Sequence, residues 1–229
     1  MPIRLNIVRR LRGMAIRTEQ IVSIIGSGYF EPVALLIERS LKWRMTKRGS
    51  VGALYYDNIY AVSVILLMVA ALESYTTRLR YFHRHIAPGQ RITVANYIKQ
   101  VFSDFRLQKA VTEVFVLRDA IFHNHLWEID FIWRPMTLRS AALLPHLEDT
   151  KFKAAIDPRT RRTRNLRLHL IPTQVTRRDA LKVMDVVWKV LLFLERKDRK
   201  YCYVSDHHVP FHGKMHLFSE VRAALAKAL

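Results

Sequence analysis

Apolar residues recur at intervals of three and four along most of the chain, the spacing that places them on one face of an α-helix. This pattern predicts helices at residues 3–25, 31–44, 55–83, 93–102, 104–127, 178–197 and 219–228. Between residues 59 and 72 nearly every helix face is apolar, which is typical of a central helix covered on several sides. Thr176 and Asp179 stand at the spacing of a capping box, which favours a helix start at this point.

Two short segments instead alternate polar and apolar residues, the pattern of half-buried β-strands. They are residues 128–133 and 165–170, and we expect them to form a small hairpin or ribbon. The span between them carries Pro135, Pro145 and Pro158 and is expected to be a surface excursion. The predicted fold class is therefore mainly α: a helical bundle with a small β-hairpin insert and flanking N- and C-terminal helices.

The same patterns divide the chain into three parts. Residues 1–54 are predicted to be amphipathic helices that pack on the core, although their arginine-rich start also fits an organellar transit peptide. Residues 55–200 form the bundle, with the insert at about residues 128–175. Residues 201–229 form a histidine-rich tail and a short helix.

Lysine and arginine outnumber the acidic residues by 38 to 19, which gives a net charge of +19. Such an excess attracts polyanions, so RNA is the first partner that it suggests and an anionic membrane surface the second. The longest apolar run, residues 59–72, is shorter than the ~20 residues that span a bilayer, and we expect no membrane partner. Cys202 is the single cysteine, which excludes an intrachain disulfide and favours a cytoplasmic location.

The basic residues are clustered rather than mixed with acids. Residues 159–178 contain seven arginines and no acidic residue. These are Arg159, Arg161, Arg162, Arg164, Arg167, Arg177 and Arg178. They form either a solvated loop or an arm that follows the phosphates of RNA, and the overall charge favours the arm.

One predicted helix carries polar residues inside its apolar stripe. The stripe consists of Val111, Val114, Phe115, Arg118, Ile121, Phe122 and His125. An arginine in the middle of a packing face costs free energy unless it meets an acid, a phosphate or another subunit. Arg118 is thus either a structural ion pair, with Glu73 on the neighbouring helix as its partner, or part of a functional site.

The residues around Arg118 resemble a known motif. The run Leu-Arg-Asp-Ala-Ile-Phe-His-Asn at residues 117–124 resembles the signature of the HEPN superfamily, in which four to six residues separate an arginine from a histidine. The helix ending Ala-Leu-Glu-Ser-Tyr at residues 71–75, the order of the helices and the closing helix at 178–197 are similar too, so the resemblance covers about residues 55–200. It implies a bundle that dimerises with two motif helices face to face and, in many members, a metal-independent endoribonuclease.

Cleavage of RNA without a metal needs a base for the ribose 2′-OH, an acid for the 5′-oxygen and positive charge beside the developing phosphorane. The resemblance implies that Arg118 supplies the charge and a histidine acts as acid or base. His123 has the four-residue spacing but lies roughly 140° around the helix from Arg118, whereas His125 has the six-residue spacing and shares its face. We expect His123 before His125, because across a face-to-face dimer it can reach the other arginine.

Three neighbours complete this candidate site. Asp119, in the polar slot of the motif, is expected to orient the arginine or a histidine unless it is an ordinary solvated residue. Glu73 and Asn124 are expected to support the catalytic groups. The catalytic candidates are therefore Arg118, His123, Asp119 and His125, acting without a metal or a cofactor.

A rival site lies in the tail, where one carboxylate and several imidazoles stand close in sequence. They are Asp206, His207, His208, His212 and His216. Such a set is sufficient for zinc. Pro210 and Gly213 disrupt a helix here and no cysteine pair supports a metal site, so a polar tail that contacts RNA is favoured.

The leading functional hypothesis is a homodimeric, metal-independent endoribonuclease, a toxin or antiviral defence effector that an antitoxin or other regulatory protein holds in check. The alternative is a non-catalytic RNA-binding or adaptor subunit of a larger complex. Resemblance of fold alone does not separate the two.

Overall fold

The structure is a computed structural model of the 229-residue chain. It describes the backbone of residues 4–11, 14–21, 26–42, 51–83, 92–123, 127–133, 136–143 and 150–229, and the side chains of residues 26–42, 57–83, 92–122 and 151–229. Within these ranges the helices are α1 (Phe30–Lys42), α2 (Val51–His83), α3 (Val94–Val101), α4 (Gln108–His123), α5 (Thr150–Ala155), α6 (Arg177–Lys197) and α7 (Phe218–Lys227). The antiparallel strand pairs are β1 (Arg4–Leu11) with β2 (Met14–Ile21), β3 (Trp127–Trp133) with β4 (Met136–Leu143), β5 (Ile156–Asp157) with β6 (Arg162–Thr163), and β7 (His208–Phe211) with β8 (Lys214–Leu217). The predicted fold class, mainly α with a small β insert, is confirmed.

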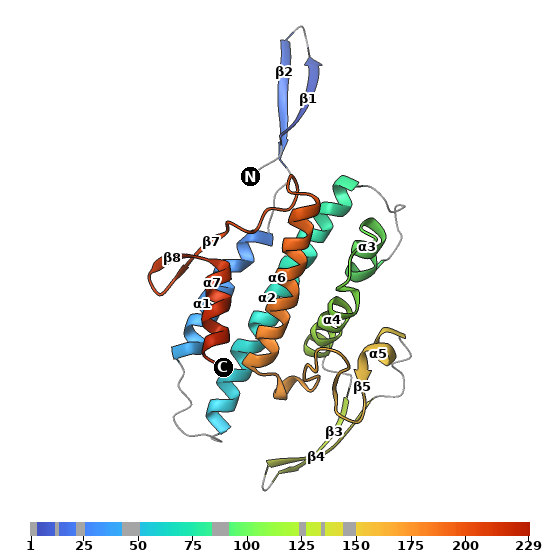
Figure 1. The fold of residues 1–229 in the computed structure, drawn as a ribbon, viewed down its shortest axis with the longest axis vertical. Coiled ribbons are helices and arrows are strands. Elements are labelled where there is room, and N and C mark those ends of the chain that lie inside the picture. The colour runs from blue at the N-terminus through green and yellow to red at the C-terminus, as the bar shows by residue number, and fades with distance from the viewer. Residues whose placement is uncertain are drawn as a thin grey trace.

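Helix α2 forms the centre of the bundle, as its apolar faces predict. It packs against α6, α1 and α4, and Figure 1 shows α1 and α7 on one side of this centre and α3 and α4 on the other. Ile65, Met68 and Leu72 are fully buried along it. Burial of several such side chains, each contributing about 1.5–3 kcal/mol, accounts for the central position of this helix.

Helix α2 also contains a segment, Asp57–His83, that is long and apolar enough to cross a membrane by length and composition alone. Half of its most apolar stretch is buried inside the fold, and the core helix of a soluble protein passes the same test. Among the described residues, no other helix is long and apolar enough to cross a membrane.

The start of α6 is fixed by the predicted capping box. The carboxylate of Asp179 accepts hydrogen bonds from the backbone N–H of Thr176 at 2.9 Å and from the ring of His169 at 2.9 Å. Burial by itself would raise the pKa of Asp179, but these hydrogen bonds outweigh it and lower the pKa. Asp179 therefore joins the arginine-rich segment to the last long helix.

The prediction of a helix at residues 3–25 is wrong, because β1 and β2 form an antiparallel hairpin there that stands away from the helices in Figure 1. The apolar residues Leu5, Ile7 and Leu11 also fit a period of two, and Ile7 pairs with Thr18 on the partner strand. Leu11 pairs with Met14, so only two residues join the strands, and one of the two is a glycine, as short hairpins favour. The amphipathic helices predicted for residues 1–54 thus reduce to α1 before the start of α2.

The predicted insert is partly wrong as well. Strand β3 coincides with the predicted strand at 128–133, but its partner is β4 rather than residues 165–170. Residues 165–170 hold only an isolated bridge, between Arg162 and His169. Their alternation arises because Leu168 and Leu170 are both buried in a compact loop. Helix α5 and the β7–β8 hairpin in the tail were not predicted, because each is too short to show a clear period.

Candidate functional site

Four charged side chains from three helices meet beside the C-terminal half of α4. Arg118 of α4 donates from Nη2 to Oε1 of Glu73 in α2 at 3.2 Å. Its Nε lies 3.1 Å from Oδ1 of Asp119, an ion pair in which the N–H does not point at the oxygen. Lys151 of α5 donates to Oδ2 of Asp119 at 2.8 Å. The chain of contacts Glu73–Arg118–Asp119–Lys151 is the charged cluster of the candidate site.

Arg118 is held in place and is still accessible. Its guanidinium lies over the ring of Phe115, one turn earlier, with 5.2 Å between the guanidinium carbon and the ring centroid. The Arg118 side chain is 26% exposed and that of Glu73 is 43% exposed. A stacked guanidinium with one open side has the geometry that recognises a phosphate or a carboxylate. Arg118 is therefore neither sequestered in the core nor free on the surface.

Asp119 is not the ordinary solvated residue that one interpretation of the sequence allowed. It is 8% exposed and lies between Arg118 and Lys151. A carboxylate buried to this degree needs such partners, because an unpaired buried charge is strongly unfavourable. Asp119 thus contacts both Arg118 and Lys151, and its role in orienting Arg118 stays a prediction.

A cavity of about 660 Å³ opens beside the cluster. Its lining comes from α2, α3, α4, α5 and the residues just before α3: Glu73, Arg80, Ile92, Thr93, Val94, Ala95, Asn96, Thr112, Phe115, Arg118, Asp119, Lys151 and Ala154. The N-terminus of α3, where Oγ1 of Thr93 accepts a hydrogen bond from the backbone N–H of Asn96 at 3.2 Å, adds the positive end of a helix dipole. This volume is in the range of small-molecule and nucleotide sites.

Arg80 is the third cation of this cavity. Its Nη2 donates to the carbonyl of Ile92 at 2.8 Å, and its guanidinium carbon lies 5.0 Å from the ring centroid of Tyr97. Burial raises the pKa of Tyr97, although the nearby charge of Arg80 opposes this. With Arg80, Arg118 and Lys151 against Glu73 and Asp119, the cavity lining carries one net positive charge. The lining can therefore attract one anionic group, which would compete with Glu73 for the guanidinium of Arg118.

Two of these residues could not be found from the sequence. Lys151 belongs to α5, which was not predicted, and Arg80 lies near the end of the predicted helix at 55–83 without belonging to any motif. Both reach the cluster through tertiary contacts between separate helices. Periodicity along one segment carries no signal for such contacts.

The histidines of the motif fall at the limit of the described part. His123 is the last residue of α4, but its side chain, like all of Asn124 and His125, lies outside the described residues. The apolar stripe of this helix is also shifted from the predicted one: Leu117 is fully buried, whereas Phe122 is 63% exposed. One turn after Arg118, the same side of α4 therefore carries the exposed aromatic ring of Phe122.

The arginine-rich segment is a compact loop, and contact of its arginines with RNA stays a prediction. Glu113 of α4, only 1% exposed, holds it by accepting hydrogen bonds from the backbone N–H and side-chain amide of Asn165 at 2.8 and 2.6 Å. The backbone N–H of Leu166 donates to the other oxygen at 2.8 Å. Sequence reasoning missed Glu113, although an acid between Val111 and Val114 on a packing helix was an available signal.

The arginines of this loop fall into two groups. Arg162 donates to His169, Arg167 pairs with Asp157 at 3.2 Å, and Arg177 forms an ion pair with Asp57 of α2. The second group has no carboxylate partner among the described residues and comprises Arg159, Arg161, Arg164 and Arg178. Of the first group, Arg167 and Arg177 are paired with carboxylates, whereas Arg162 contacts only the ring of His169.

The histidines of the tail are spread over the β7–β8 hairpin. His212, at its turn with a φ of 51°, donates its backbone N–H to Glu38 of α1, and His216 contacts Glu220 of α7. His207 packs against Phe30, with 5.0 Å between the ring centroids, and burial lowers its pKa. Among the described residues no group of three His, Cys, Asp or Glu side chains could hold a metal ion.

Comparisons with protein-family models, with curated proteins and with solved structures give no significant match. The HEPN resemblance therefore rests on the motif residues and the order of the helices alone.

Proposed function

We propose that this protein is a metal-independent endoribonuclease that acts as a homodimer, in the manner of a toxin or antiviral defence effector. The observation that carries the proposal is the setting of Arg118, which lines a cavity of about 660 Å³ with its guanidinium stacked on Phe115 and oriented by two carboxylates. A purely structural ion pair does not require an adjoining cavity. The net charge of +19 supports RNA as the substrate.

The chemistry assigns one task to each group. Arg118 stabilises the negative charge that develops on the phosphorane, while Asp119 and Glu73 position Arg118. His123 transfers a proton, as base toward the ribose 2′-OH or as acid toward the 5′-oxygen, because imidazole changes charge near neutral pH, and solvent water takes or gives the other proton. The 2′-oxygen attacks phosphorus and the 5′-oxygen leaves with a proton, so the products are a 2′,3′-cyclic phosphate and a 5′-hydroxyl.

The dimer supplies what one subunit lacks. His123 lies about 140° around α4 from Arg118, too far for the two to serve one phosphate from a single helix. Phe122, 63% exposed and one turn from Arg118, provides apolar surface for a second copy. A two-fold axis at this surface brings each arginine toward the histidine of the other subunit.

The test is incubation of purified protein with total RNA in EDTA, beside Arg118→Ala, His123→Ala and the matched control Arg39→Ala from exposed α1. We expect cleavage by the wild type and by Arg39→Ala, and loss of cleavage in the two motif variants. Cleavage that persists in both motif variants would refute the assignment of the site.

Mixing the two inactive variants tests the composite site. In a mixed dimer, one of the two sites combines an intact arginine with an intact histidine, so up to about a quarter of wild-type activity should return. No recovery, with mixed dimers demonstrated by light scattering and pull-down, would place both groups in one subunit.

The alternative function, a non-catalytic RNA-binding or adaptor subunit, is favoured by the charge balance of the cluster. Glu73 and Asp119 already engage Arg118, which is the arrangement of a structural ion pair. RNA that stays intact with every variant, while binding is retained, would establish this alternative.

A further inference from the structure

A second, larger hollow lies between the turn preceding α4 and the exposed face of α6. It has a volume of about 960 Å³ and shares no lining residue with the cavity beside Arg118. Its apolar lining comes from Phe105, Leu107, Leu192 and Phe193, of which Phe105 is fully buried and the other three are half-buried. We call this hollow the α6 groove.

The rim of the α6 groove is strongly basic. Arg106, Lys189, Arg196 and Arg199 are all exposed there. None of the four has a carboxylate partner among the described residues, although Arg199 lies over the ring of Tyr203. Lys189 and Arg196 are seven residues apart and so stand on one side of α6, about 10 Å apart along its axis.

The two acidic residues of the α6 groove are engaged elsewhere. Asp104 pairs with Lys197 at 2.7 Å, and this hydrogen bond lowers its pKa. Glu195 is 7% exposed and accepts hydrogen bonds from the backbone N–H and hydroxyl of Ser205 at 2.9 and 2.7 Å. The four rim cations therefore keep most of their charge, unlike Arg118 in the other cavity.

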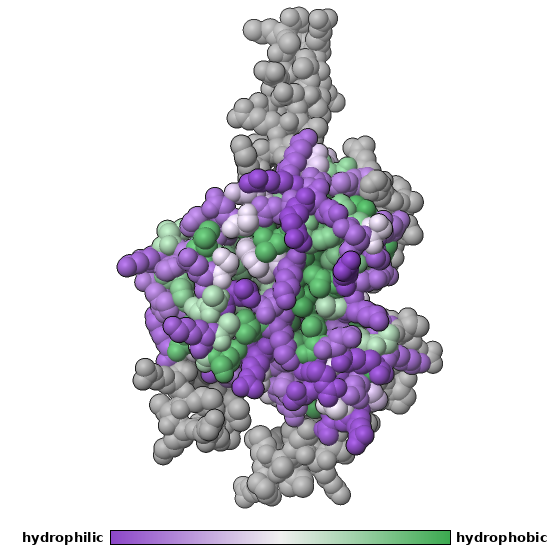
Figure 2. Space-filling view, viewed as in Figure 1, coloured by the Kyte–Doolittle hydropathy of each residue, from purple (hydrophilic) through white to green (hydrophobic). Residues whose placement is uncertain are grey.

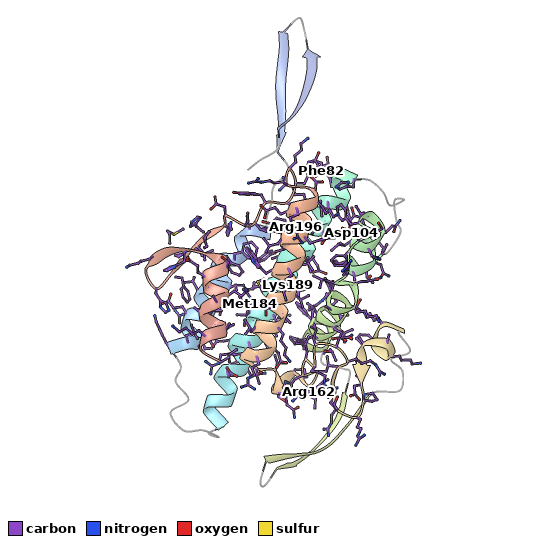
Figure 3. All side chains as sticks on the ribbon, in the orientation of Figure 1. Phe82, Asp104, Arg162, Met184, Lys189 and Arg196 are labelled. Carbon is purple, nitrogen blue, oxygen red and sulfur yellow. The ribbon has the colours of Figure 1, made fainter. Side chains whose placement is uncertain are left out.

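The figures show this face of the molecule directly. Figure 2 shows an apolar strip bounded by hydrophilic ridges where α6 and α4 lie side by side. In Figure 3, Arg162, Lys189 and Arg196 follow one another along this face, from the arginine-rich loop toward the end of α6, and Asp104 lies across from Arg196. The arginine-rich loop thus lies at the other end of this face, outside the lining of the α6 groove.

We propose that the α6 groove binds single-stranded RNA, with phosphates on the basic rim and bases against the apolar lining. A row of cations follows a phosphate backbone, and an apolar, partly aromatic wall accepts unpaired bases, which is how sequence-tolerant single-strand sites are built. A duplex hides its bases and so uses only the basic rim, and an acidic peptide offers carboxylates in place of a regular row of phosphates. The inference concerns binding only and does not require that Arg118 cleaves RNA.

Fluorescence anisotropy with a labelled single-stranded RNA of about 12 nucleotides tests the groove over about 50–200 mM salt. The test variant carries Arg106→Ala, Lys189→Ala and Arg196→Ala. The matched control carries Arg39→Ala, Lys214→Ala and Lys227→Ala, which removes the same charge from exposed positions on α1, β8 and α7. Thermal melts verify that both remain folded.

We expect the test variant to bind about 10- to 100-fold more weakly and its salt slope to fall by about 2, since each single-strand phosphate contact contributes about 0.7. The control should change affinity less than about 3-fold. Equal losses of affinity in the two variants would mean that binding depends on net charge alone, and this would overturn the proposal.

The ligand is tested with four competitors. Unlabelled single-stranded RNA should compete about 10-fold better than an abasic phosphodiester of equal length, because only the former offers bases. An RNA duplex or a polyglutamate peptide that competes as well as the single strand would overturn single-stranded RNA as the occupant. Cleavage at saturating RNA, measured in parallel, separates failure of the groove from failure of the proposed ribonuclease.

Discussion

The cavity beside Arg118 and the α6 groove are both lined by cations, but they differ in whether carboxylates lie against those cations. In the cavity, Glu73 and Asp119 sit against Arg118, and the third cation, Arg80, is tied to a backbone carbonyl. In the groove, the rim cations face solvent while the acids are paired elsewhere. The first arrangement fixes the direction of one guanidinium, and the second leaves charge available over a longer surface.

This difference separates chemistry from binding. Stabilising a transition state requires donors held in place before the charge develops, and carboxylate neighbours provide that at the expense of ground-state affinity. Holding a flexible polyanion requires unpaired cations and little precision. A protein that cuts RNA benefits from having both, on separate surfaces.

The largest expected effect comes from removing the fixed cation. Arg118→Ala should lower kcat about 10²- to 10³-fold, the usual cost of one transition-state donor, while RNA affinity changes less than about 3-fold. Single-turnover kinetics at saturating RNA measure the first value and anisotropy the second. The α6 groove triple variant should show the opposite pattern. A loss of affinity in Arg118→Ala as large as its loss of turnover would abolish the distinction between the two regions.

The next effect concerns the arginine-rich loop that precedes α6. Glu113→Gln replaces a buried carboxylate that accepts three hydrogen bonds, so we expect a loss of about 1.5–3 kcal/mol in the free energy of unfolding. Urea denaturation measures it, with exposed Glu31→Gln as a control that should stay within about 0.5 kcal/mol. If Glu113→Gln were neutral, the loop would not owe its position to this anchor.

The sequence predicted the parts of the fold whose signal is long and local. Helices α2, α4 and α6 were predicted within a few residues because periodicity persists over many turns and a capping box marks the start of α6. The N-terminal hairpin was missed because its apolar residues fit both a helical and a two-residue period. Strand β4 was missed because it lies among prolines and its alternation of apolar and polar residues is not sustained, and helix α5 was missed because it has only six residues.

The candidate site was predictable only where one helix carries it. An arginine inside an apolar stripe pointed to Arg118, and the need for an acid pointed to Glu73 as its partner. Lys151 and the groove residues come from different elements that meet only in three dimensions. Cation clustering in the sequence instead drew attention to the loop at residues 159–178, where three of the seven arginines are paired internally.

A smaller effect should follow from removing a carboxylate beside Arg118, which leaves this cation less paired, as the cations of the groove are. Glu73→Gln removes one of the two acids at Arg118 and raises the net charge of the lining by one. We expect a nucleoside monophosphate to bind about 3- to 10-fold more tightly, as titration calorimetry would measure, because the guanidinium no longer has to exchange a carboxylate for a phosphate. Cleavage should fall, because Arg118 loses a positioning contact. Unchanged affinity would mean that Glu73 does not compete with anions for Arg118.

The smallest effect applies the same comparison to two single arginines of one loop. Arg159 is exposed and has no carboxylate partner among the described residues, whereas Arg167 pairs with Asp157 at 3.2 Å. Arg159→Ala should lower the salt slope of RNA binding by about 0.7, and Arg167→Ala should change it by less than half of that, because its charge is already neutralised. Anisotropy over about 50–200 mM salt resolves this difference, which is about 2-fold in affinity across the range. Equal salt slopes for the two variants would show that internal pairing does not decide which arginines contact phosphate. The contrast between unpaired cations in the groove and paired cations in the cavity would then not explain RNA binding.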